Sequence, residues 1–107
     1  MTEFDPEKFE EKFVHYFPEL QRAYKRAFER MNDRRDSQLV HAIDQQVLNE
    51  SEPFYEGPGA DPTFRIELPD EPYDRLRGVV VDRNRFERIL EEYVSELERS
   101  LEEEFAG

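Results

Sequence analysis

Residues 19–31, Glu-Leu-Gln-Arg-Ala-Tyr-Lys-Arg-Ala-Phe-Glu-Arg-Met, carry the most regular apolar pattern in the chain. Apolar side chains recur there at i, i+3, i+4, i+7, i+8 and i+11, at Leu20, Ala23, Tyr24, Ala27, Phe28 and Met31. This spacing places them on one side of an α-helix of about 3.6 residues per turn. The stretch therefore predicts a helix that covers a core with one face.

The other face of this predicted helix is basic, because Arg22, Arg26 and Arg30 follow one another at intervals of four residues. Clustered arginines can bind the phosphates of a nucleic acid or a nucleotide. They can also pair with the glutamates of an acidic helix elsewhere in the chain. We favour internal ion pairing, because a chain with a net charge of -12 repels nucleic acid.

A helix is also expected before this stretch, at residues 5–17. Asp5 is a suitable N-cap, and Pro18 disfavours the helical conformation of the residue before it. The aromatic residues of the segment would form one stripe on the core, made of Phe9, Phe13, Tyr16 and Phe17.

After a polar turn, residues 37–49 predict a third helix with Asp36 or Ser37 as its N-cap. Its inner face would consist of Leu39, Val40, Ile43, Val47 and Leu48. The N-terminal half of the chain is thus expected to be helical.

The C-terminal part predicts a long helix from Asp82, as N-cap, to about Glu104, with apolar residues at intervals of three and four. About 22 residues at ~1.5 Å per residue would span ~33 Å, which is longer than a single small globule requires. Part of the helix should then pack against something outside its own fold. Together with the many aromatic residues, this makes a homodimer our structural prediction.

Between the helical parts, residues 50–63 are so rich in proline and glycine that we expect a loop. Phe64, Ile66 and Leu68 alternate with charged residues and predict a strand, which would pair with a second strand at residues 77–82. The expected fold is α+β and predominantly helical, with three N-terminal helices, a two-stranded β-ribbon and a long C-terminal helix. Residues 1–107 would form a single domain.

The composition limits the classes of protein. The 107 residues include 27 acidic and 15 basic side chains, of which 12 are arginine and three are lysine, and no cysteine. An acidic, lysine-poor surface suits concentrated salt, where self-repulsion is screened. The absence of cysteine excludes thiol catalysis and thiolate metal sites, and it fits a cytoplasmic protein. The longest apolar run, Val79 to Val81, is too short to span a membrane.

Two segments carry a resemblance to a known family. Asp5-Pro-Glu-Lys-Phe-Glu-Glu-Lys-Phe-Val-His-Tyr-Phe-Pro-Glu-Leu20 and Gly78-Val-Val-Val-Asp-Arg-Asn-Arg-Phe-Glu87 resemble a small family of uncharacterised proteins from halophilic archaea. The resemblance extends over nearly the whole chain. It implies a salt-rich habitat and assigns no activity, cofactor or functional residue.

Candidate sites are few. His15 and His41 lack the ligand spacing of known metal-binding helices, and no serine lies in a glycine-rich elbow. We therefore expect neither a metal nor another cofactor. The hypothesis is a non-enzymatic interaction or adaptor protein, whose candidate surface combines the arginine stripe with the aromatic pair Phe54 and Tyr55. The alternatives are a module that contacts nucleic acid or a nucleotide through the stripe, and an enzyme whose site is dispersed along the chain.

Overall fold

The computed structural model describes residues 5–56 and 63–105 of the chain. In chain order the elements are α1 (Pro6–Phe9), α2 (Lys12–His15), α3 (Phe17–Arg34), α4 (Ser37–Gln46), the 3-10 turn η1 (Leu48–Glu50), β1 (Glu52–Tyr55), β2 (Phe64–Glu67), the 3-10 turn η2 (Pro72–Arg75) and α5 (Arg83–Phe105). The fold is α+β and predominantly helical, with one two-stranded antiparallel sheet, which confirms the fold class predicted from the sequence.

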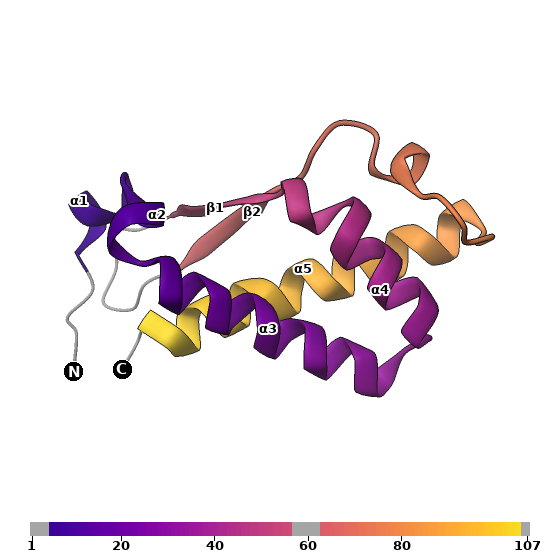
Figure 1. Ribbon diagram of the computed structural model, residues 1–107, viewed down its shortest axis with the longest axis horizontal. Coiled ribbons are helices and arrows are strands. Elements are labelled where there is room, and N and C mark those ends of the chain that lie inside the picture. The colour runs from indigo at the N-terminus through magenta and orange to yellow at the C-terminus, as the bar shows by residue number, and fades with distance from the viewer. Residues whose placement is uncertain (1–4, 57–62, 106–107) are drawn as a thin grey trace.

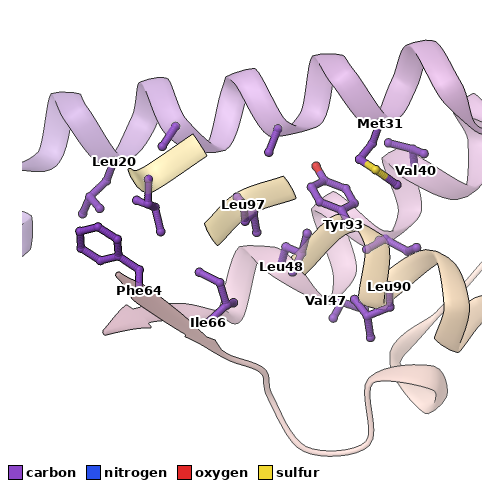
Figure 2. Packing of buried hydrophobic residues seen from close by; sticks show 14 of the residues in the cluster. Leu20, Met31, Val40, Val47, Leu48, Phe64, Ile66, Leu90, Tyr93 and Leu97 are labelled. Atoms are coloured by element: carbon purple, nitrogen blue, oxygen red, sulfur yellow. The ribbon is translucent and has the colours of Figure 1, made fainter. Parts of the chain in front are cut away.

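The centre of the molecule is the antiparallel pair of long helices α3 and α5 (Figure 1). Helix α4 and the sheet pack against this pair, and all of them contribute to one core. Figure 2 shows Leu20 and Phe64 at one end of the core and Met31 and Val40 at the other. Leu97 and Tyr93 of α5 lie between these two ends.

The predicted caps explain where several helices begin. The Asp36 carboxylate accepts a hydrogen bond from the backbone N–H of Gln38 at 3.0 Å, and that of Asp82 accepts one from Arg85 at 3.1 Å. Each bond satisfies a backbone donor that the first turn of a helix leaves free. Asp36, not Ser37, is thus the cap of α4.

The first predicted helix is interrupted, which corrects the expected aromatic stripe. Two short helices, α1 and α2, replace it, and α3 begins at Phe17 after a non-helical Tyr16. The interruption rotates successive aromatic rings to different sides. Phe9 and Tyr16 are 3% and 2% exposed, whereas Phe13 and Phe17 are 58% and 47% exposed.

The predicted strand pairing was wrong. Phe64–Glu67 does form a strand, but its partner is Glu52–Tyr55, inside the segment that we expected to be a loop. Pro53, opposite Ile66, has no N–H to donate, and a two-stranded sheet tolerates this because each strand is an edge. Residues 77–82, the predicted partner strand, are outside any helix or strand, and Val80 is fully exposed. The prolines and glycines at positions 57–62 lie outside the described residues.

The expectation that α5 extends beyond its own fold was also wrong. The helix has 23 residues, about 34 Å at ~1.5 Å per residue, and the molecule measures 43 Å along its longest axis. Apolar side chains are buried along the whole helix, at Phe86, Ile89, Leu90, Tyr93, Leu97, Leu101 and Phe105. Its length therefore supplies no argument for a dimer.

Candidate functional site

The arginine stripe of α3 faces the glutamates of α5. Arg22 Nε lies 2.7 Å from Glu104, and Arg26 Nη2 lies 3.3 Å from the same carboxylate. Arg30 Nη1 lies 2.9 Å from Glu103 and 3.3 Å from Glu96. The ladder continues beyond the stripe in ion pairs of Arg34 and Arg35 with Glu92 and Glu96.

These contacts alter the proton affinities of the glutamates. Burial alone would raise the pKa of Glu96, but hydrogen bonds from Arg34 and Arg30 outweigh it and lower the pKa. A hydrogen bond from Arg35 lowers the pKa of Glu92. The interpretation of the stripe as an internal ion-pair face is thus confirmed, and a nucleic acid bound there would have to compete with these carboxylates.

The aromatic pair at residues 54 and 55 is also engaged within the chain. The Lys12 ammonium lies 4.7 Å from the centre of the Phe54 ring, and Arg65 lies over the same ring at 5.0 Å. The Tyr55 ring packs edge-on against Phe64, with 6.0 Å between their centres. Through its contact with Lys12, Phe54 helps to hold α2 against β1.

A groove that the sequence did not indicate lies beside α3 and α4. It has a volume of about 510 Å³, within the range of about 300–1,000 Å³ that is usual for binding sites. Its lining comes from α2, α3, α4, η1 and the start of β1: Phe13, Phe17, Leu20, Gln21, Tyr24, Asp44, Gln45, Leu48, Asn49, Ser51 and Pro53. Aromatic and aliphatic groups alternate there with side-chain amides and hydroxyls.

The mouth of the groove is unusually apolar for so charged a chain. Phe13 and Phe17 both line it, and Val14, next to Phe13, is 76% exposed. Among the described residues, these three and Val80 are the large apolar side chains that remain exposed. Two of the four, Phe13 and Phe17, thus line the same groove, and contiguous exposed apolar surface commonly marks a contact site.

A cluster of polar groups borders the wall of the groove. Tyr93 donates its hydroxyl to Asp44 Oδ1 at 3.4 Å, and the hydroxyls of Tyr24 and Ser51 are 3.0 Å apart. Ser51 Oγ donates to the carbonyl of Leu48 at 2.6 Å, so Tyr24 is the donor toward Ser51. The hydroxyl of Ser51 is therefore fixed by local bonds and is not activated by a base.

Asp44 is the carboxylate of this groove. Burial raises its pKa, although the hydrogen bond from Tyr93 and the charge of His41 act in the opposite direction. Burial likewise raises the pKa of Tyr24 and of Tyr93, so both hydroxyls stay protonated near neutral pH. The groove thus combines a poorly solvated carboxylate with neutral donors and aromatic rings.

The two histidines lie apart from each other and make local contacts. His41 Nδ1 is 2.9 Å from the carbonyl oxygen of Ser37, and its ring packs on Phe28. His15 lies 3.7 Å from Glu11. Within residues 5–56 and 63–105, no three histidine, aspartate or glutamate side chains form a group suited to a metal ion, and no helix is long and apolar enough to cross a membrane.

The sequence analysis did not predict the groove, because the groove depends on the interruptions of the first predicted helix near residues 10–11 and at residue 16. If these interruptions are taken into account, Phe13 and Phe17 no longer share a helix face with Phe9, and their exposure can be expected. Asp44 offered no such signal, since it is one of 27 acidic residues and only its tertiary neighbours distinguish it.

These features define a small α+β protein that is built on an antiparallel helix pair closed by ion pairs, with an open apolar groove on α3 and α4. The chain belongs to a family of unknown function (DUF5783), whose model matches residues 1–106. Neither a curated protein nor a solved structure matches the chain.

Proposed function

We propose that the chain is a non-enzymatic protein-interaction module that receives a segment of a partner protein in the groove. The observation that carries this proposal is that the exposed rings of Phe13 and Phe17 both line a groove of about 510 Å³. Exposing aromatic rings to water is costly, and a partner that covers them gains their burial.

The polar lining supports a peptide as the occupant. Gln21, Gln45 and Asn49 are exposed amides along the groove, and each can both donate to and accept from a peptide backbone. An adaptor role fits a groove of this kind better than catalysis does, because the Ser51 hydroxyl is held by Tyr24 and Leu48.

The acidic, lysine-poor surface belongs to the same proposal as an adaptation to concentrated salt. Of the 15 basic residues, 12 are arginine, which pairs with carboxylates through two parallel hydrogen bonds more readily than lysine does. At ~1 M salt the Debye length is ~3 Å, so the net charge of -12 no longer strains the fold.

Site-specific photo-crosslinking in the native high-salt extract tests the proposal. A photoreactive residue replaces Gln21, which lines the groove, or Gln38, an exposed glutamine of α4 that does not. We expect a crosslinked product from position 21 and little from position 38. The product should disappear when Phe13→Ser and Phe17→Ser are added, because the mouth then loses its apolar surface.

Equal products from both positions, or a product that survives the serine substitutions, would contradict the proposal. Circular dichroism of the double variant checks that the fold is retained, which is expected because Phe13 and Phe17 are 58% and 47% exposed. The mass of the product also tests the homodimer, which stays a prediction: twice the chain mass of 12.9 kDa would identify a second copy as the partner.

A further inference from the structure

We infer that the groove anchors a cationic side chain, namely an arginine within an apolar segment of the partner protein, between Asp44 and the aromatic rings of Phe13, Phe17 and Tyr24. This inference rests on the proposed interaction function. It specifies the chemistry of the group that the groove selects.

The first argument is the lack of an arginine or lysine partner at Asp44. On the opposite side of α3, the carboxylates of the ion-pair ladder have arginine partners, as Glu96 does at 2.9 Å and Glu104 at 2.7 Å. Over the described ranges, no lysine or arginine forms an ion pair with Asp44, which accepts a hydrogen bond from the Tyr93 hydroxyl. A chain rich in arginine thus leaves this carboxylate, in a groove, without an arginine or lysine partner, and only the neighbouring His41 places a positive charge near it.

The surroundings of Asp44 favour a cation from outside. Burial raises its pKa, which shows that the ionised form is poorly stabilised in the free protein. A guanidinium placed beside it would supply the missing stabilisation. In a partly desolvated groove this attraction is also screened less by salt than an exposed pair would be.

The second argument is a cation that the chain itself already holds next to the groove. The Lys12 ammonium lies 2.7 Å from Glu52 and 5.4 Å from the centre of the Phe13 ring, and its side chain is 6% exposed. The rings of Phe9 and Phe54 complete its surroundings at 5.4 and 4.7 Å. One carboxylate and several aromatic rings therefore suffice to keep a cation buried in this part of the fold.

The groove offers the same combination without its cation. Phe13 borders both sites, Asp44 takes the position of the carboxylate, and Phe17 and Tyr24 add further rings. Arginine suits the wider groove better than lysine, because its planar guanidinium stacks on aromatic faces and is less strongly hydrated. The apolar mouth requires apolar residues beside that arginine.

The test uses butylguanidinium as a probe for the arginine side chain and butylurea as its uncharged counterpart, with the full-length ¹⁵N-labelled chain at 0.5 M KCl. We expect butylguanidinium to shift the amide signals of Tyr24, Asp44 and Gln45, with a dissociation constant of about 1–10 mM for so small a ligand. Butylurea should bind at least about fivefold more weakly than butylguanidinium, because it forms no ion pair.

Two variants separate the carboxylate of the groove from general acidity. Asp44→Asn should weaken butylguanidinium about fivefold or more and leave butylurea unchanged, whereas Asp33→Asn, at an exposed residue of α3, should affect neither. Binding should also lower the pKa of Asp44, which carboxyl ¹³C shifts report, since a nearby cation favours the ionised form.

The cation inference is overturned if the two probes bind equally, if Asp44→Asn has no effect on butylguanidinium, or if neither probe shifts the signals of the groove. Each of these results leaves the interaction function to be judged by the crosslinks from position 21. A dimer that dissociates on Asp44→Asn substitution, detected by sedimentation, would instead assign the arginine to a second copy and overturn the choice of a different protein.

Discussion

The ion-pair ladder between α3 and α5 allows a quantitative prediction at Glu96. This glutamate is buried, with its side chain 8% exposed, and contacts Arg30 at 3.3 Å and Arg34 at 2.9 Å. Glu96→Gln removes the charge and keeps the shape. Because the two arginine side chains are 34% and 48% exposed, the interaction is best treated at the dielectric constant of water.

At that dielectric constant, two unit charges ~3 Å apart attract by about 1.4 kcal/mol, so the two pairs together contribute about 2.8 kcal/mol. The cost of removing the carboxylate from water offsets part of this gain. We therefore expect Glu96→Gln to lower the free energy of unfolding by about 1–2 kcal/mol in 0.1 M KCl, and by clearly less in 1 M KCl, where the Debye length is ~3 Å.

Urea unfolding followed by circular dichroism measures this change, with Glu87→Gln as the matched control. Glu87 belongs to the same helix and pairs with Arg83 at 3.6 Å, but its side chain is 57% exposed, so its loss should cost less than about 0.5 kcal/mol. If Glu96→Gln costs no more than this control, or costs the same at both salt concentrations, the ladder does not stabilise the fold as argued.

The pH dependence gives the same test independently. The folded-state pKa of Glu96 is lowered, so its contribution is fully present above the pKa of a free glutamate, about 4.3, and is lost as the pH falls through the lowered value. The difference in stability between wild type and Glu96→Gln should therefore be largest near pH 7 and should shrink in acid.

Two further predictions concern the groove and the solvent. Asp44→Asn should raise the melting temperature at pH 7 by about 2–4 °C, because burial raises the pKa of Asp44 and the amide carries no charge. This gain in melting temperature should vanish below about pH 4, where the Asp44 carboxyl group of the wild type is protonated. A variant that melts at a lower temperature than wild type at pH 7 would contradict the argument. The melting temperature of wild type should rise by about 5 °C or more between 0.1 and 2 M KCl, and a salt-independent value would contradict salt adaptation.

Local sequence signals were sufficient for the long helices. The apolar spacing of residues 19–31 and the cap at Asp82 correspond to α3 and α5, because both depend on residues within one or two turns. The pairing of Arg22, Arg26 and Arg30 with α5 could also be predicted, since opposite charges on two amphipathic helices leave few other arrangements.

The sheet and the groove could not be predicted in this way. Pairing of Glu52–Tyr55 with Phe64–Glu67 is decided by where Phe64 and Ile66 can reach the core. The prolines and glycines of residues 50–63 argued against a strand in that segment. The groove depends on α2, α3, α4 and β1 meeting at one place, and on the interruption that turns Phe13 away from Phe9.

The two sides of α3 differ in a way that bears on the proposed interaction and on the proposed adaptation to concentrated salt. On one side, the arginines of α3 and the glutamates of α5 form ion pairs within the chain. Salt weakens the exposed ion pairs, but recognition of a partner does not depend on them. On the other side, recognition would depend on aromatic burial and on one half-buried carboxylate, the contacts that molar salt affects least. Asp44→Asn should make the free protein more stable and the bound state weaker. These two outcomes together would indicate that Asp44 serves the proposed binding of a partner more than the stability of the fold.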